Sequence, residues 1–150
     1  MKYDLSKFPG RLKQARMEKG LTRRQVSEMA DISEKGVYLY EKKSRNASVL
    51  IMVTLADVLD VSVGWLLGNE NKAKMKYDLS KIHTRLRSAR KSKNLTPYEL
   101  AEKSGVSVFC ISETELDYSI PRIGTVAKLA NALEVSVDWL CGGECDESDI

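Results

Sequence analysis

The chain of 150 residues carries 24 Lys or Arg and 21 Asp or Glu, a formal net charge of +3, and is 43% hydrophobic. Its three cysteines are an odd number, which does not fit the disulfide framework of small secreted domains. No signal-peptide pattern opens the chain, and no apolar run approaches the roughly 20 residues of a membrane-spanning helix. These features argue against a secreted or membrane protein and predict a cytoplasmic location.

The chain contains an internal sequence repeat with an offset of 74 residues. Residues 21–41 (LTRRQVSEMADISEKGVYLYE) align with residues 95–115 (LTPYELAEKSGVSVFCISETE), and MKYDLSK occurs at residues 1–7 and 75–81. A length of 150 residues alone would suggest one domain, but a repeat at a fixed offset indicates two, so we predict two domains. The expected ranges are 1–70 for the first domain, 71–76 for a linker, 77–143 for the second domain and 144–150 for an acidic tail.

The two copies differ in charge. Residues 1–74 hold 14 Lys or Arg and 9 Asp or Glu, a net charge of +5, whereas residues 75–150 hold 10 and 12, a net charge of −2. Because net charge governs attraction to nucleic acid, we expect the two copies to contact different partners or surfaces.

Five helices and no strand are expected in each copy. Apolar residues at helical spacing place the first helix at about residues 6–19, ended by Gly20, and the fourth at about residues 49–59. A short fifth helix contains Trp65, a large core anchor that returns as Trp139 in the second copy. The predicted fold class is therefore all-α, with two tandem five-helix units.

The second and third helices form the stretch around which each copy is organised. Thr22 and Ser33 are good N-caps, and a turn at residues 31–33 separates two short helices. A helix pair of this kind presents its second helix outward. The spacing predicts inward side chains at Val26, Met29, Ala30, Val37 and Tyr40.

Both copies resemble the Cro and C1 repressor type helix-turn-helix family of lambdoid phages and bacterial regulators. The segments that carry the resemblance are RLKQAR, GLTRRQV, DIS, YLYE and LADVLDVSVGWLLG in the first copy, and RLRSAR, NLTPYEL, GVS, ISETE and LANALEVSVDWL in the second. The resemblance covers almost the whole chain. It implies two lambda-repressor-like DNA-binding domains in a bacterial or phage-type, nucleoid-associated protein. It also implies a structural ion pair in each copy, Arg16 with Glu41 and Arg90 with Glu115.

In this family the third helix enters the major groove while the second lies across the DNA backbone. The matching base-facing positions of the first copy are Glu34, Lys35 and Tyr38, and they fit a half-site containing G·C pairs. Arg23 stands where the family often has glutamine, which favours phosphate binding over base reading. A solvated charged surface is the alternative interpretation. The expected phosphate contacts are Arg23, Arg24, Ser33, Lys42, Lys43, Arg45 and Asn46.

The second copy departs further from the family pattern. Its corresponding positions are Ser107, Val108, Phe109 and Ser112, so apolar contact with a thymine methyl replaces hydrogen bonding to bases. Pro97 and Tyr98 replace the paired arginines, while Glu113 and Asp117 add negative charge. Whether this copy contacts DNA is left open.

The fourth helix of the first copy is unusually apolar. A helix at a protein surface needs only one apolar side, so Leu50, Ile51 and Val53 are expected to form an interface. The partner is either the second copy, in an intramolecular pseudo-dimer, or another chain, in a homodimer. A linker of about ten residues spans at most about 33–36 Å, which is close to the roughly 34 Å between paired recognition helices.

No enzyme is expected. His83 has no nucleophile partner in the pattern, and Cys141 and Cys145 beside Asp146 and Glu147 lack the ligand spacing of a zinc site. We expect no metal, cofactor or small-molecule ligand domain. The resemblance implies a sequence-specific transcriptional regulator, a repressor, with double-stranded DNA as its partner. The alternative is a protein-interaction module, such as an antitoxin or anti-repressor, whose second domain and first-domain fourth helix bind a protein.

Overall fold

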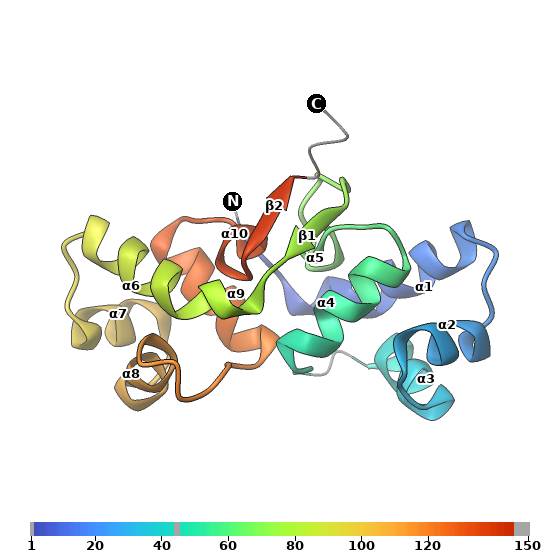
Figure 1. Ribbon diagram of the computed structural model, residues 1–150, viewed down its shortest axis with the longest axis horizontal. Helices are drawn as coiled ribbons and strands as arrows, with labels where there is room; N and C mark the ends of the chain where they lie inside the picture. Colours follow the sequence, from blue (N-terminus) through green and yellow to red (C-terminus); the bar gives the residue numbers. More distant parts are fainter. Residues whose placement is uncertain (1, 44–45, 146–150) are drawn as a thin grey trace.

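The computed structural model describes residues 2–43 and 46–145, and both copies are built mainly of helices (Figure 1). The first copy contains η1 (Leu5–Lys7), α1 (Phe8–Glu18), α2 (Arg23–Ala30), α3 (Glu34–Lys42), α4 (Val49–Val58) and α5 (Val63–Leu66). The second contains β1 (Met75–Tyr77), η2 (Leu79–Lys81), α6 (Ile82–Ser92), α7 (Pro97–Ser104), α8 (Val108–Glu115), α9 (Ile123–Leu133), α10 (Val137–Leu140) and β2 (Gly143–Cys145). The predicted all-α fold of two tandem five-helix units is confirmed.

Matching caps start the second and third helices of each copy. Thr22 forms a capping box with Gln25, each side chain accepting from the other residue's N–H, and Thr96 does the same with Glu99. The turn after the second helix is left-handed in both copies, at Asp31 (φ 56°) and Gly105 (φ 77°). Asp adopts this conformation less readily than Gly. The helix-turn-helix geometry is nevertheless the same in both copies.

The buried apolar residues of both copies form one continuous core. Phe8, Leu12 and Val37 of the first copy are fully buried, as the helical spacing indicates. The inward position predicted for Met29 is wrong, because its side chain is 56% exposed. On a helix of only eight residues, the neighbouring Val26 and Ala30 already fill the side that faces the core.

The expectation of no strand is wrong at two short segments. β1 pairs with β2 in antiparallel register, with Met75 opposite Cys145 and Tyr77 opposite Gly143. Three-residue strands are too short to show an alternating pattern in the sequence. β1 therefore begins within the segment expected to be a linker, and β2 extends into the expected tail, whose residues 146–150 lie outside the described residues.

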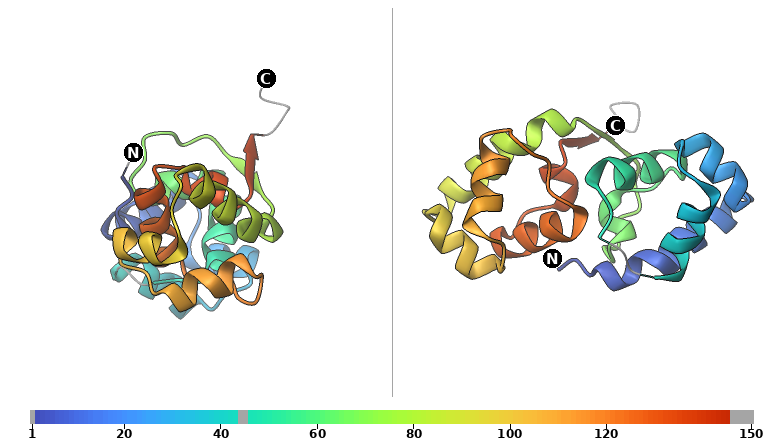
Figure 2. Two further views of the ribbon diagram at one scale, coloured as in Figure 1. Left: turned by 90° about the vertical axis from the view of Figure 1, so that its left-hand side faces the viewer. Right: turned by 90° about the horizontal axis from the view of Figure 1, so that it is seen from below.

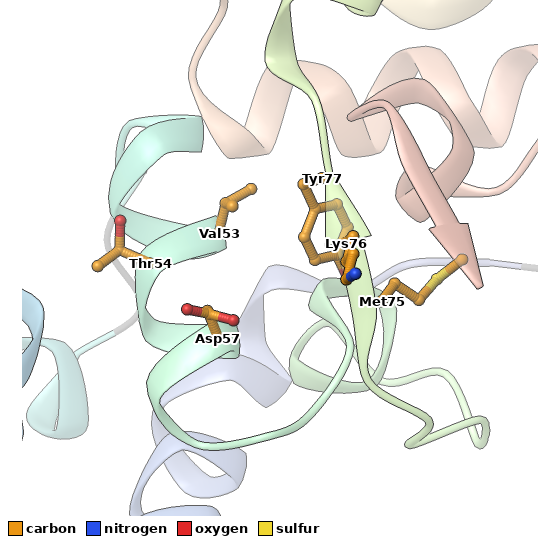
Figure 3. A pocket seen from close by; sticks show the side chains of 6 residues that line it. All are labelled: Val53, Thr54, Asp57, Met75, Lys76 and Tyr77. Atoms are coloured by element: carbon orange, nitrogen blue, oxygen red, sulfur yellow. The ribbon is translucent and has the colours of Figure 1, made fainter. Parts of the chain in front are cut away.

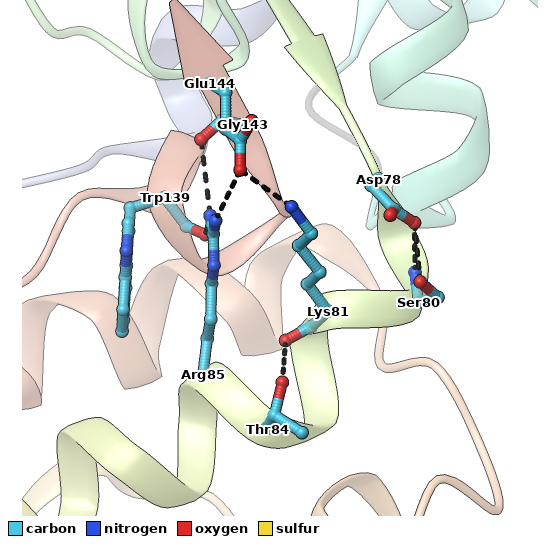
Figure 4. Close-up of polar contacts among 8 residues, drawn as sticks. All are labelled: Asp78, Ser80, Lys81, Thr84, Arg85, Trp139, Gly143 and Glu144. Atoms are coloured by element: carbon cyan, nitrogen blue, oxygen red, sulfur yellow. Dashed lines mark hydrogen bonds and ion pairs between the residues drawn. The ribbon is translucent and has the colours of Figure 1, made fainter.

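Polar contacts hold β2 against the start of the second copy (Figure 4). Arg85 donates from Nη1 to the carbonyls of Trp139 (2.6 Å) and Gly143 (3.2 Å), and Lys81 Nζ lies 2.7 Å from Glu144 Oε1. Gly142 has φ +81°, and a Cβ there would lie 1.8 Å from the carbonyl oxygen of Asp78. Only glycine fits where these two segments meet.

The segment before β1 is bonded to the first copy. Ser62 donates from its hydroxyl to the carbonyl of Asn71 at 2.7 Å, and Lys74 Nζ lies 3.0 Å from Asp60 Oδ1. Hydrogen bonds from Lys19 and then Lys74 lower the pKa of Asp60. The connection between the copies is therefore fastened at several points along its length.

The two copies lie side by side in a two-fold-like arrangement (Figures 1 and 2). α4, α5, α9 and α10 lie in the middle, and α5 contacts α10 directly. α3 and α8 lie at opposite ends of one face, the lower face of Figure 1. Within the described residues, no helix has the length and apolar character needed to cross a membrane.

Candidate nucleic-acid interface

Three residues predicted to face DNA bases lie on the outer side of α3. Glu34 and Lys35 are exposed in its first turn, and Tyr38 is exposed one turn later. Ser33 begins the helix, its hydroxyl accepting from the N–H of Gly36 at 2.9 Å. These side chains share one exposed end of α3, the end that a groove-entering helix presents to base edges.

Two cations flank the Tyr38 ring. The guanidinium carbon of Arg23 lies 5.3 Å from the ring centroid, and Lys42 Nζ lies 5.5 Å from it. Arg23 also places Nε 3.4 Å from Glu41 Oε2, so its side chain is held from two directions. Cation–π contact of this kind orients a positive charge beside an exposed aromatic ring. Arg23 is therefore positioned between α2 and α3.

The remaining predicted phosphate contacts differ in what they touch. Arg24 is well exposed and pairs only loosely with Glu28, 3.3 Å away, and Lys43 is exposed. Asn46 instead uses its side-chain oxygen to accept from the N–H of Gly124 at 2.7 Å. Arg45 lies outside the described residues. The exposed cations of the first copy thus stand around α3, whereas Asn46 is engaged with the second copy.

A buried ion pair fixes the third helix in each copy. Arg16 binds both carboxylate oxygens of Glu41 at 3.0 Å and also donates to the Leu21 carbonyl at 2.9 Å. Arg90 binds Glu115 at 2.8 Å in the same bidentate way, and the bonds to Glu115 raise the pKa of Arg90. Bidentate Arg–carboxylate contacts are geometrically specific. Each pair therefore sets the position of the third helix relative to the first.

The second copy presents a different surface at the same place. Ser107 caps α8, and Val108 and Ser112 are half-buried along it. Three aromatic side chains, Tyr98, Phe109 and Tyr118, are each 73% exposed. Large exposed apolar side chains are a feature of binding surfaces. Glu113 on α8 and Asp117 just after it add negative charge, so electrostatic attraction to phosphate is weaker here than around α3.

The sequence analysis did not identify a role for a second arginine on the first helix of each copy, Arg11 and its counterpart Arg85. Arg11 donates to the Trp65 carbonyl at 2.6 Å and lies over the Trp65 ring at 4.8 Å. Arg85 makes the same two contacts with Trp139, at 2.6 Å and 5.2 Å. The repetition of RL at the start of RLKQAR and RLRSAR was the available signal. These arginines tie the first helix to the fifth.

The residues expected at an interface on α4 are only partly covered. Leu50 is 62% exposed, whereas Ile51 and Val53 are half-buried and pack against the core. Val53 lines an open pocket of about 430 Å³ with Thr54, Asp57 and the three residues of β1 (Figure 3). The second copy therefore contacts α4 of the first through β1.

Within the described ranges 2–43 and 46–145, no three His, Cys, Asp or Glu side chains gather to hold a metal. Cys141 is fully buried, and burial, together with the charge of Asp138, raises the pKa of its thiol. Asp146 and Glu147 lie outside the described residues. His83 Nδ1 lies 3.8 Å from Asp117 Oδ1, at the side of α6.

The helix-turn-helix family model matches the chain twice, at residues 12–66 and 86–140. The chain therefore belongs to the Cro/C1-type helix-turn-helix family, a class of DNA-binding domain found in transcriptional regulators. Among its relatives is the cryptic phage CTXphi transcriptional repressor RstR of Vibrio cholerae, 37% identical over 62 residues. Another is the uncharacterised HTH-type transcriptional regulator YqaE of Bacillus subtilis, 36% identical over 62 residues. Each alignment covers 41% of this chain, which spans about half the length of either relative.

Proposed function

We propose that this protein is a sequence-specific DNA-binding transcriptional regulator that works as a two-headed reader within one chain. The observation that supports this most directly is the placement of α3 and α8 at opposite ends of one face (Figures 1 and 2). In helix-turn-helix dimers, two recognition helices placed this way enter successive major grooves one DNA turn apart. The similarity to RstR supports repression as the regulatory outcome.

The first copy supplies the hydrogen bonds to bases and most of the electrostatic attraction to DNA. Lys35 can donate to guanine and Glu34 can accept from a cytosine amino group, so together they favour G·C pairs. The exposed Arg24, Lys42 and Lys43 around α3 bind phosphates and add affinity that depends on salt. Arg23, held beside Tyr38 and Glu41, reaches the backbone from the start of α2.

The second copy acts as a second, unlike reader. Val108 and Phe109 at the start of α8 present apolar surface in the place where Glu34 and Lys35 stand on α3. Apolar side chains recognise the thymine methyl in the major groove. The operator is therefore expected to contain two different half-sites, one with G·C pairs and one rich in thymine.

Selection from a random duplex DNA pool tests this function directly. The expected result is an enriched site with two unlike half-sites whose centres lie about one helical turn, roughly 34 Å, apart. Enrichment of a single half-site would show that α8 does not read bases, but it would still support a DNA-binding regulator. An absence of both enrichment and salt-dependent binding would overturn the DNA-binding function.

A protein-interaction module is the second candidate, supported by the exposed aromatic side chains of the second copy. Tyr98, Phe109 and Tyr118 fit a protein surface as well as a DNA groove. Substituting Phe109→Ala separates the two candidates. A loss of binding to the thymine-rich half-site favours DNA reading, whereas unchanged recognition of both half-sites favours a protein partner at α8.

A further inference from the structure

The two copies exchange equivalent contacts across their interface. Tyr77, which begins the second copy, accepts from the N–H of Val63 at the start of α5 (2.8 Å). Tyr3, at the equivalent position of the first copy, accepts from the N–H of Val137 at the start of α10 (3.1 Å). Each copy thus places a tyrosine hydroxyl on the fifth helix of the other, as a two-fold axis would require.

The symmetry is broken next to these contacts, at Gly64 and its counterpart Asp138. Asp138 is only 6% exposed, and its Oδ1 accepts from the N–H of Gly64 (3.1 Å) and from the hydroxyl of Tyr77 (2.5 Å). A Cβ on Gly64 would lie 2.5 Å from Asp138 Oδ2. The carboxylate of one copy therefore occupies the space that the absent side chain of the other leaves.

A second position shows the same complementarity at the other end of the interface. The side-chain oxygen of Asn46 accepts from the N–H of Gly124 at 2.7 Å, and a Cβ on Gly124 would lie 2.8 Å from this oxygen. The counterparts of these residues are Ile120 and Leu50, both exposed and apolar. A polar side chain facing a glycine on one side of the axis is replaced by two apolar side chains on the other.

The hydrogen bonds that hold the N-terminal segment around Tyr3 also occur in only one of the two copies. Asn131 on α9 accepts from the N–H of Tyr3 (2.8 Å) and donates to its carbonyl (3.2 Å). The counterpart on α4 is Asp57, and an ionised carboxylate has no hydrogen to donate. Asp57 lies instead beside the open pocket under β1 (Figure 3). Each arm therefore fits the copy against which it is packed.

Like pairing would lose this fit. Two second copies facing each other would bring two Asp138 carboxylates together in a buried position, and buried like charges are strongly unfavourable. Two first copies would place Gly64 against Gly64, with no carboxylate in the space that Asp138 fills or to accept from the N–H of Gly64. The unlike pair is the one in which the buried donors, acceptors and volumes match.

We propose that this interface is specific for unlike copies, with Gly64 and Asp138 as the main determinant, so that the partner of each copy is the other copy of the same chain. This pairing of the copies does not depend on whether the assembled molecule binds DNA. It assigns Val53 of α4 and the region around α10 to contacts within one chain rather than to a second chain, while Leu50 stays exposed.

Four full-length proteins test this directly. The first is the native chain, with Gly64 and Asp138. The second, Gly64→Asp, has aspartate at both positions, and the third, Asp138→Gly, has glycine at both. The fourth carries both substitutions, so that the two residues are exchanged. The urea midpoint of each is measured. Both single variants should unfold at lower urea, and the exchanged variant should recover most of the loss. If the exchanged variant loses as much stability as the two single variants added together, the two positions are not coupled and the proposal is overturned.

A milder pair of substitutions keeps the test decisive if Gly64→Asp does not fold. Gly64→Ala should lower the midpoint in the native background, where Asp138 Oδ2 occupies the space, but have little effect in the Asp138→Ala background. An equal loss in both backgrounds would overturn the proposal. Light scattering on the native chain should give the mass of one chain, and a mass of two chains would contradict pairing within the chain.

Discussion

α3 and α8 are held by the same kinds of contacts within their copies, but the side chains around them on the outer surface differ. Both are capped by serine, preceded by a left-handed turn and fixed by a bidentate Arg–Glu pair. Their outer surfaces share almost nothing, because Lys42 and Lys43 of one copy correspond to Leu116 and Asp117 of the other. The residues that hold the recognition helix and those that face outward are therefore separate sets. The two copies share the first set and differ in the second.

The largest expected effect lies in the shared set. Substituting Glu41→Ala or Glu115→Ala leaves a buried arginine unpaired, so each should reduce the free energy of unfolding by roughly 3–5 kcal/mol. Urea denaturation followed by the fluorescence of Trp65 and Trp139 measures both. Glu102→Ala, at an exposed position of α7, is the control and should change stability by less than about 0.5 kcal/mol. A large loss in one copy and none in the other would contradict the equivalence of the scaffolds.

The next effect distinguishes the two base-facing surfaces. Lys35→Ala should weaken discrimination at the G·C-containing half-site by about 1–3 kcal/mol, because a donor to guanine is lost. Competition binding with duplexes altered in one half-site measures this change. Phe109→Ala at the equivalent position is the matched control, and its effect should be confined to the other half-site. Equal effects of Lys35→Ala on both half-sites would argue against separate readers.

A smaller effect concerns phosphate binding. Replacing Lys42 and Lys43 together by alanine should lower the slope of log affinity against log salt by about 2, because two counterion-releasing contacts disappear. Circular dichroism should show unchanged helix content. The matched change at Leu116 and Asp117 should leave the slope unaltered or steepen it as an acidic group is lost. An unchanged slope after loss of both lysines would place the DNA elsewhere on the molecule.

The smallest effect is the pH dependence that Asp138 adds to the stability of the second copy. Burial raises the pKa of Asp138 above the ordinary value of an aspartate, despite hydrogen bonds from Tyr77 and Gly64 that act in the opposite direction. The folded chain therefore holds this proton more tightly than the unfolded chain, and stability from it is lost as pH rises through the folded-state pKa. Comparing native and Asp138→Asn unfolding free energies between pH 4 and pH 8 isolates this contribution. A difference that does not change with pH would show that Asp138 titrates normally.

Much of the fold was predictable because its signals are local or repeated. Caps such as Thr22 and the 74-residue repeat are visible in the sequence, so the helices and their order followed. Two features depend on contacts between distant segments and were missed. The β1–β2 sheet joins residues about 70 positions apart, and the role of Gly64 is defined only by Asp138 across the interface. The DNA-facing residues of α3 and α8 remain predictions.

The connection between the copies, bonded at several points, bears on which spacing between half-sites the proposed function allows. Bonds from Asn71 and Lys74 to the first copy, followed by β1 in the sheet with β2, leave little slack between the copies. A loosely tethered pair of heads would tolerate extra base pairs between half-sites, since a flexible tether samples many separations. A rigid body cannot follow an inserted base pair, which both lengthens the site and rotates one half-site around the helix axis. Under the proposed function, in which both copies read DNA, we therefore expect the protein to accept only one spacing between the two half-sites.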